Sequence, residues 1–246
     1  MNHYYIMVRM KKVLLIFAHP DDETFSSSGT IVRLTRNGYD ARLITATKGE
    51  EGMLGDPPLA TRETIGKIRE KELREAAKIT GISKIYFLGF IDGTLQNIPQ
   101  KKLETKILPI IKKEQPDIVI TFEKNGISMH PDHKAVSKAT TECFMEYMKT
   151  AKHHVRLYHV CLPATHVAIH HKAGFRYEYF GKMEGTPDHE ISTKVNIQSV
   201  YKIKVSAMRR HRTQKKDYET LLKRNELISG DKHEHFKLIA ENKLVV

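Results

Sequence analysis

Two tetrapeptides of the chain share one order of residue types: a histidine, a proline, an aspartate and then a second residue that can bind a metal. They are His19-Pro20-Asp21-Asp22 and His130-Pro131-Asp132-His133. Proline disfavours the α conformation in the residue before it and suits the first turn of a helix. Each motif therefore predicts a histidine that ends an extended segment, followed by two polar side chains in the first turn of a helix.

Three of these side chains, His19, Asp22 and His133, could form a catalytic zinc site. Catalytic zinc takes three protein ligands from histidine and carboxylate and keeps one position for water. Two neutral imidazoles and one carboxylate leave the complex positively charged, so the metal stays a good Lewis acid and can bring the pKa of bound water to about 7. The same ligand types form the facial triad of non-haem iron oxygenases, so Fe²⁺ or another divalent metal is an alternative.

The other polar residues of the two motifs could supply acid–base catalysis. Asp21 is available as the general base for the water, and His130 could donate to a developing oxyanion or leaving amine, with Asp132 orienting and charging its ring. Each motif also has a purely structural interpretation. The acidic run Asp21–Glu23 could be favourable charge at a helix N-terminus, and the two histidines of the second motif could be exposed loop residues.

The elements that must position these motifs follow from the hydrophobic pattern, in which short apolar, β-branched runs alternate with longer amphipathic segments. Strands are predicted at Val13–Ala18, Ala41–Thr47, Lys84–Phe90, Asp117–Glu123, Arg156–Leu162 and Glu190–Asn196. Helices are predicted at Thr24–Asn37, Thr61–Thr80, Gln100–Gln115, Asp132–Lys149 and Gln198–His211. Pro109 lies inside the third helical segment and is expected to kink or split it.

Strands that alternate with helices imply right-handed crossovers and a sheet covered on both faces. We predict an α/β fold, a Rossmann-like three-layer sandwich with a mostly parallel central sheet. In such sheets ligands bind at the carboxyl ends of the strands, so both motifs should meet at one edge. No linker divides the chain, which predicts a single domain over residues 1–246, with residues 166–189 as a candidate active-site flap.

The composition, 40% hydrophobic and 28% charged residues among 246, is ordinary for a soluble globular protein. Cys143 and Cys161 are too few for a disulfide framework, which fits a cytoplasmic protein. The longest apolar runs are too short to cross a bilayer, so no membrane association is expected. The other histidines, including the pairs His153-His154 and His170-His171, are expected at the surface.

The net charge of +12 raises nucleic acid or an anionic substrate as a partner. Basic residues are mixed with acidic ones, as in Lys67–Lys78, which favours a solvated helix surface. The chain has no helix-turn-helix, zinc-finger or aromatic RNA-binding pattern. A nucleic-acid-binding protein is therefore the weakest alternative, and we predict a small-molecule substrate without nucleic acid, with a homo-oligomer left open.

Ala18–Glu23 together with His130–His133 resembles the LmbE-like, or PIG-L, family of zinc-dependent N-acetylglucosaminide deacetylases. The resemblance covers most of the chain, through Thr47–Gly52, Arg69–Leu73, Leu88–Gly93 and His211–Gln214. Within the family, Gly55–Thr64 is most similar to bacillithiol-biosynthesis deacetylases. Ser128 and Met129 depart from relatives that carry an aromatic residue or an arginine in that loop.

The resemblance implies zinc on His19, Asp22 and His133. It implies Asp21 as the general base, and His130 with Asp132 as a charged acid pair. The implied reaction is removal of the N-acetyl group from an N-acetylglucosamine-containing small molecule, with N-acetylglucosaminyl malate as one candidate and a chito-oligosaccharide or an inositol conjugate as alternatives.

The resemblance also implies that Arg69 and Asp92 reach the sugar or its aglycone. A guanidinium and a carboxylate suit hydroxyl groups or an acidic aglycone such as malate. The structural alternative is that Arg69 belongs to a charge-rich helix and Asp92 to the turn at Gly93.

Overall fold

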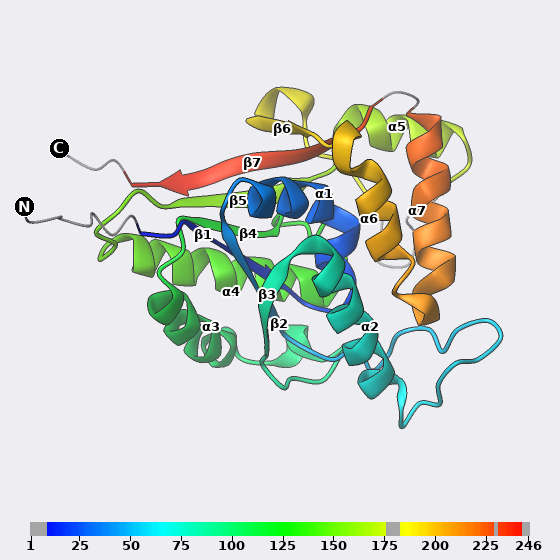
Figure 1. The fold of residues 1–246 in the computed structure, drawn as a ribbon, viewed down its shortest axis with the longest axis horizontal. Coiled ribbons are helices and arrows are strands. Elements are labelled where there is room, and N and C mark those ends of the chain that lie inside the picture. The colour runs from blue at the N-terminus through cyan, green and yellow to red at the C-terminus, as the bar shows by residue number, and fades with distance from the viewer. Residues whose placement is uncertain (1–8, 176–182, 229–230, 243–246) are drawn as a thin grey trace, which may run out of the picture.

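A seven-stranded sheet forms the centre of the computed structural model, which describes residues 9–175, 183–228 and 231–242 (Figure 1). The strands are β1 (Lys12–Phe17), β2 (Asp40–Thr45), β3 (Ile82–Phe87), β4 (Ile118–Phe122), β5 (Arg156–Cys161), β6 (Thr193–Asn196) and β7 (His233–Glu241). Their order across the sheet is β3-β2-β1-β4-β5-β7-β6. The strands β1 to β5 run parallel, and β7 pairs antiparallel with both β5 and β6.

The central strands are apolar because helices cover both of their faces. In β1 the residues Val13–Phe17 are all buried, and every residue of β4 is buried as well. Strands buried on two sides have continuous rather than alternating apolar sequences. The two strands therefore form a rigid core from which the loops at their carboxyl ends project.

Helices connect these strands on both sides of the sheet. Their bounds are α1 (Asp22–Arg36), α2 (Ile65–Thr80), α3 (Gln100–Glu114), α4 (Pro131–Met148), α5 (Ala164–Lys172), α6 (Tyr201–Met208) and α7 (Lys215–Leu227). Short 3₁₀ turns occur at Leu95–Asn97, Asp188–Glu190, Gln198–Val200 and Arg212–Gln214.

The helices form two layers, one on each face of the sheet, and the chain changes face between β1 and β4. Helices α1, α2 and α6 pack together on one face, and α3 and α4 pack together on the other (Figure 1). The crossovers that leave β1 and β4 therefore run to opposite faces of the sheet. In α/β sheets, ligands bind where the connections after two neighbouring strands run to opposite faces. The loops after β1 and β4 therefore mark the expected site.

The predicted α/β sandwich with a mostly parallel sheet is confirmed. All six predicted strands and five predicted helices are present, with ends that differ by a few residues. The segment Gln198–His211 is a 3₁₀ turn followed by α6 rather than one helix. Helices α5 and α7 and strand β7 were not predicted.

The split expected at Pro109 does not occur, because α3 runs unbroken from Gln100 to Glu114. Proline removes one backbone hydrogen bond to the carbonyl four residues earlier. That carbonyl belongs to Thr105. Both Thr105 and Pro109 are exposed, so a water molecule can donate the missing hydrogen bond to the carbonyl.

The candidate flap over residues 166–189 begins within α5, so its first residues are helical. Residues 176–182 of this segment lie outside the described residues, and its role stays a prediction. Within the described ranges, no helix combines the length and apolarity needed to cross a membrane.

Candidate active site

The two His-Pro-Asp motifs meet at the carboxyl ends of the neighbouring strands β1 and β4. His19 follows β1 directly, and His130 is the N-cap of α4, with Pro131 in the first turn as expected. The Nδ1 atom of His19 lies 3.1 Å from the Nε2 atom of His133, although the residues are far apart in sequence. The spatial convergence of the motifs is thus present in the structure.

The side chains of His19, Asp22 and His133 form a triangle of potential metal ligands. Besides the 3.1 Å between the two imidazoles, Asp22 Oδ1 lies 3.2 Å from His133 Nε2, and Asp22 Oδ2 lies 3.5 Å from His19 Nδ1. Zinc bonds of about 2.0–2.1 Å in a tetrahedron give ligand-to-ligand distances of about 3.3 Å. The residues present therefore fit a divalent metal with three protein ligands.

Each imidazole of this triangle is held through its other nitrogen. His133 Nδ1 lies 3.0 Å from the carbonyl of Gly126 and donates to it, which leaves the Nε2 lone pair toward the triangle. Gly126 has φ +73°, and a Cβ there would come 2.9 Å from the Cβ of His133. Metal-binding histidines are typically oriented by such a bond to a carbonyl or carboxylate.

His19 is oriented by two carboxylates, those of Asp92 and Asp132. Its Nε2 atom lies 2.8 Å from Asp92 Oδ1 and 3.3 Å from Asp132 Oδ2, so Nδ1 is the nitrogen free to bind a metal. Burial disfavours a charged His19, but hydrogen bonds to Asp132, Asp22 and Asp92 raise its pKa well above the usual value. The electrostatic field therefore favours a cation at this position.

Asp92 and Asp132, which were expected to bind substrate and to orient His130, both contact His19 in the structure. Asp132 faces His19 and also accepts the N–H groups of Gly93 at 2.7 Å and Leu95 at 2.9 Å. Burial opposes ionisation of Asp92, but His19 lowers the pKa of this carboxyl to about 2. The structure places Asp92 against His19, and its expected contact with substrate stays a prediction.

Asp21, the expected general base, is buried beside the triangle in a conformation that is rare for a non-glycine residue, with φ 116°. Its backbone N–H donates to Glu23 Oε2 at 3.2 Å, and its Oδ2 accepts from Arg69 Nη2 at 2.8 Å. Burial raises the pKa of Asp21 well above its usual value, although the charge of Arg69 opposes the shift.

Arg69 is enclosed beneath this site rather than open to a ligand. Only 3% of the residue is exposed, and its guanidinium also donates to the carbonyls of Pro20 at 2.6 Å and Gly49 at 2.9 Å. A Cβ on Gly49 or Gly52 would collide with the guanidinium, so both glycines make room for it. The structure places Arg69 against Asp21, and its expected contact with substrate stays a prediction.

His130, the expected acid, lies beside the triangle with one ring nitrogen bonded to the backbone. Its Nδ1 atom accepts the backbone N–H of Asp132 at 3.2 Å, so the ring proton is on Nε2. Burial, with the neighbouring His133 and His19, lowers the pKa of His130 to about 4. Its ring stacks on His133 at 4.6 Å, and His133 stacks on Phe122 at 4.0 Å, which fixes both imidazoles.

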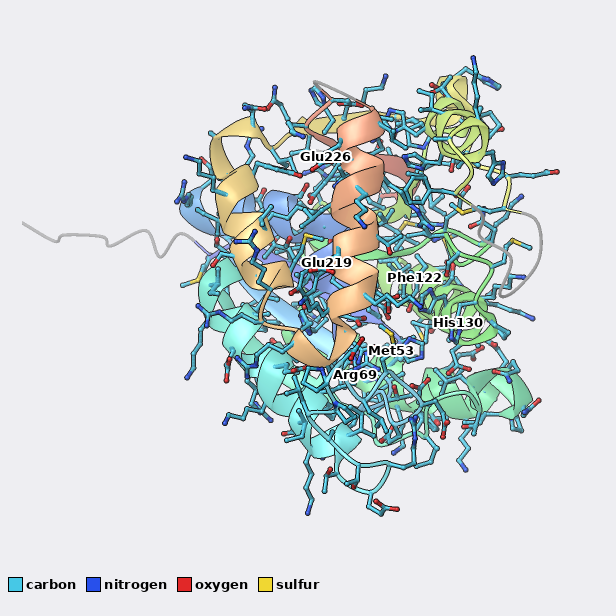
Figure 2. The ribbon with its side chains drawn as sticks, turned by 90° about the vertical axis from the view of Figure 1, so that its right-hand side faces the viewer. Met53, Arg69, Phe122, His130, Glu219 and Glu226 are labelled. Atoms are coloured by element: carbon cyan, nitrogen blue, oxygen red, sulfur yellow. The ribbon has the colours of Figure 1, made fainter. Side chains whose placement is uncertain are left out.

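A second group of buried residues supports the site and received no role in the sequence analysis. Glu72 of α2 accepts the N–H and hydroxyl of Thr213 at 2.9 and 2.7 Å, and Gln214 bonds both backbone groups of Met53. Figure 2 shows Met53 and Arg69 together beside the first turn of α7. Thr213 and Gln214 belong to the segment His211–Gln214, which the sequence analysis noted only as part of the family resemblance. That segment could have predicted this group of buried residues.

Several of the remaining histidines are buried, contrary to the surface positions expected. His170 is 2% exposed, His159 5%, His211 0% and His235 6%. Of the two named pairs, His154 and His171 are exposed as expected.

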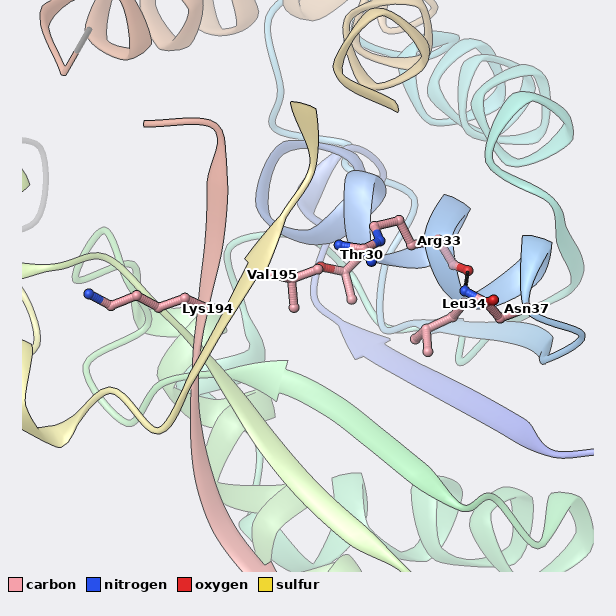
Figure 3. A pocket seen from close by; sticks show the side chains of 6 residues that line it. All are labelled: Thr30, Arg33, Leu34, Asn37, Lys194 and Val195. Atoms are coloured by element: carbon pink, nitrogen blue, oxygen red, sulfur yellow. Dashed lines mark hydrogen bonds between the residues drawn. The ribbon is translucent and has the colours of Figure 1, made fainter. Parts of the chain in front are cut away.

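A cavity of about 270 Å³ lies away from these residues, between α1 and β6 (Figure 3). It is lined by Thr30, Arg33, Leu34, Asn37, Lys194 and Val195. None of the predicted site residues lines it, so the candidate active site is defined by side-chain geometry instead.

Comparisons with known proteins identify the family of the chain. Residues 14–144 match the PIG-L family, described as GlcNAc-PI de-N-acetylase. The probable N-acetyl-alpha-D-glucosaminyl L-malate deacetylase 2 of Bacillus subtilis (strain 168) is 32% identical over 219 residues, which are 87% of this chain and 90% of that protein. The protein of the same name in Bacillus anthracis is 38% identical over 137 residues, which are 55% of this chain and 60% of the relative.

A solved structure shares the fold. The N,N'-diacetylchitobiose deacetylase from Pyrococcus horikoshii, in complex with an inhibitor, has a TM-score of 0.69 and 23% identity, covering 93% of this chain and 84% of that one. The family match spans both the first motif and the second, where the potential metal ligands lie. On these grounds the chain belongs to the PIG-L family.

Proposed function

We propose that the chain is a zinc-dependent hydrolase that removes the N-acetyl group from an N-acetylglucosamine-containing small molecule. The observation that carries this proposal is the triangle of His19, Asp22 and His133 with the buried carboxylate of Asp21 beside it. Membership of the PIG-L family supports the same reaction class.

The metal would be held by His19 Nδ1, Asp22 and His133 Nε2. When bound, it would polarise the amide carbonyl and lower the pKa of a coordinated water. Imidazole and carboxylate ligands suit zinc, and they also suit Fe²⁺, so the choice of zinc is part of the proposal.

Asp21 acts as the general base and takes a proton from the attacking water. Its position depends on Arg69, which binds one carboxylate oxygen and leaves the other available. A carboxylate whose pKa is raised by burial is a better proton acceptor than an exposed one. The proton then passes to the amine as the carbon–nitrogen bond breaks and acetate leaves.

His130 donates a hydrogen bond from Nε2 to the developing oxyanion. The backbone N–H of Asp132 occupies Nδ1, so the neutral ring presents its proton at the opposite nitrogen. A donor fixed in advance stabilises charge that develops in the transition state.

For the substrate we propose N-acetylglucosaminyl malate, because relatives in three Bacillus species are named for this compound. Relatives named for an inositol-linked substrate, and the chitobiose deacetylase of the same fold, make these compounds the alternatives. Two free, buried thiols, Cys143 and Cys161, suit the reducing cytoplasm that we propose as the location.

The test is a panel of N-acetylglucosaminyl malate, an N-acetylglucosaminyl inositol and chito-oligosaccharides, scored by release of free amine. Each assay is run with metal-free protein reloaded with Zn²⁺ or Fe²⁺. Amine release from the malate compound that depends on added Zn²⁺ is expected. Asp21→Asn should lower turnover by at least 100-fold with the metal content unchanged. Normal turnover in this variant, or none with any member of the panel, would contradict the proposal.

A further inference from the structure

A second cluster of histidine and aspartate side chains lies on elements that carry none of the active-site residues. It consists of His166 in the first turn of α5, Asp231 before β7, and His235 within β7. One ligand atom from each residue lies within 4.8 Å of the other two. The three residues come from two distant parts of the sequence, so only the fold brings them together.

The strand β7 presents its histidines and its glutamate to opposite faces of the sheet. Side chains at alternate positions of a strand share a face, so His233 and His235 lie on one side and Glu234 on the other. Glu234 is used by the protein itself, since its carboxylate accepts the N–H groups of Gly29 and Thr30 at 2.9 and 2.7 Å and the ammonium of Lys204 at 2.6 Å. The side with the histidines faces α5.

Two distances in the cluster are close to those between the ligands of a metal site. Asp231 Oδ2 lies 3.1 Å from His166 Nε2 and 3.7 Å from His235 Nε2. The second distance is too long for a hydrogen bond, but the two values bracket the separation of about 3.3 Å between ligands of tetrahedral zinc. The corresponding values in the active-site triangle are 3.1, 3.2 and 3.5 Å.

The surroundings of the cluster combine carboxylates with basic groups. The other oxygen of Asp231 is bonded to His233, and a carboxylate held in this way is typical of a metal ligand. The charged groups that act on His166 and His235 are the carboxylates of Asp231 and Asp188, and the ammonium of Lys194, which is opposite His235 on β6. His235 is 6% exposed, so its imidazole is withdrawn from bulk water.

We propose that His166, Asp231 and His235 bind a second divalent transition metal of the zinc class. Imidazole and carboxylate ligands together suit zinc-class ions rather than calcium or magnesium. The ion would join the start of β7 to α5 at the edge of the sheet.

Zinc stoichiometry tests this site on the full-length, metal-free protein, by competition with a chromophoric chelator. The wild type is expected to bind two equivalents. His166→Asn and Asp231→Asn should each bind one equivalent of Zn²⁺ tightly, at the active site, and should bind Zn²⁺ at the second site at least 10-fold more weakly than the wild type does. His133→Asn should still bind one equivalent at the second site. The control is His171→Asn, an exposed histidine on the same helix, which should bind two.

A second measurement separates loss of the site from loss of folding. In the His133→Asn background, Zn²⁺ should raise the melting temperature by about a few degrees, and adding His166→Asn should abolish that rise. A single equivalent in the wild type that disappears in His133→Asn, or two equivalents in both His166→Asn and Asp231→Asn, would overturn the proposal. Neither readout depends on deacetylase activity, so the proposed function can fail without affecting this test.

Discussion

His19 is the residue on which most of the candidate site depends. Its Nδ1 atom faces His133 and Asp22, while its Nε2 atom faces two carboxylates. When the Nε2–H group of an imidazole faces two carboxylates, their negative charge makes the Nδ1 nitrogen more basic. A more basic nitrogen is a stronger metal ligand. Asp92 and Asp132 would therefore act on a bound metal through His19.

We expect Asp92→Asn to weaken Zn²⁺ binding at the active site by 10- to 100-fold, because the amide carries no charge behind His19. Zinc affinity is measured by chelator competition. Asp40→Asn is the matched control, since Asp40 is a partly buried carboxylate of β2 that is paired with Arg42 away from the site. Unchanged zinc affinity in Asp92→Asn, with a loss of substrate affinity alone, would return Asp92 to its expected role as a substrate ligand.

At the scale of elements, the site depends on loops that are fixed by glycines and by helix ends. The loop after β2 encloses the guanidinium of Arg69 between Gly49 and Gly52, and α2 supplies the arginine itself. The turn between α6 and α7 holds the same loop through Gln214 and Met53. The loop after β2, helix α2 and the turn between α6 and α7 together position Arg69, which bonds the Asp21 carboxylate.

Substitution of Gly49 tests this dependence on the loop. Gly49→Ala should place a methyl group against Arg69, displace Asp21 and lower amine release by at least 10-fold while zinc content stays the same. The control is Gly38→Ala. Gly38 also has a positive φ, +82° against +71° for Gly49, but nothing lies within 4 Å of its added Cβ.

The two alanine variants share a similar backbone strain of about 1–2 kcal/mol, so the main difference between them is the collision with Arg69. Equal losses of activity in both variants, or none in Gly49→Ala, would show that Arg69 does not position the base.

At the scale of the whole molecule, the sheet order decides which residues meet and which become buried. The neighbouring strands β1 and β4 bring the two motifs to one edge, and the antiparallel β7 covers β5. One result is that His159 of β5 is enclosed beside Thr141 of α4, with its Nε2 atom 3.0 Å from the hydroxyl. Burial lowers the pKa of His159 to about 4.

This burial predicts a pH dependence of stability. Between about pH 6.5 and pH 4 the unfolded chain protonates His159 and the folded protein does not, so the free energy of unfolding falls as the pH is lowered. A shift from 6.5 to about 4 is on the order of 3 kcal/mol at most. Urea unfolding of metal-free protein at several pH values measures this slope.

His159→Asn should reduce the slope between pH 6.5 and pH 4, while His154→Asn, at an exposed histidine, should leave it unchanged. The same slope in wild type and His159→Asn would mean that other groups account for acid destabilisation.

The sequence by itself determined the fold class and the meeting of the two motifs. Apolar strands that alternate with helices produce a parallel sheet, and the carboxyl ends of such strands lie at one edge. Because proline and helix-start signals are local, the positions of His19 and His130 relative to their strands could be predicted. Strand β7 was missed because its polar residues, among them His233 and Glu234, conceal the strand pattern.

Only the tertiary structure decided which atoms the charged side chains face. Asp132 meets His19 across 113 residues of sequence, and Arg69 meets Asp21 across 48, so no local pattern reports either contact. Each contact depends on how buried side chains from different helices and loops pack, because a buried charge requires a partner wherever the fold supplies one. For the same reason, the cluster of His166, Asp231 and His235 becomes visible only once α5 and β7 are placed side by side.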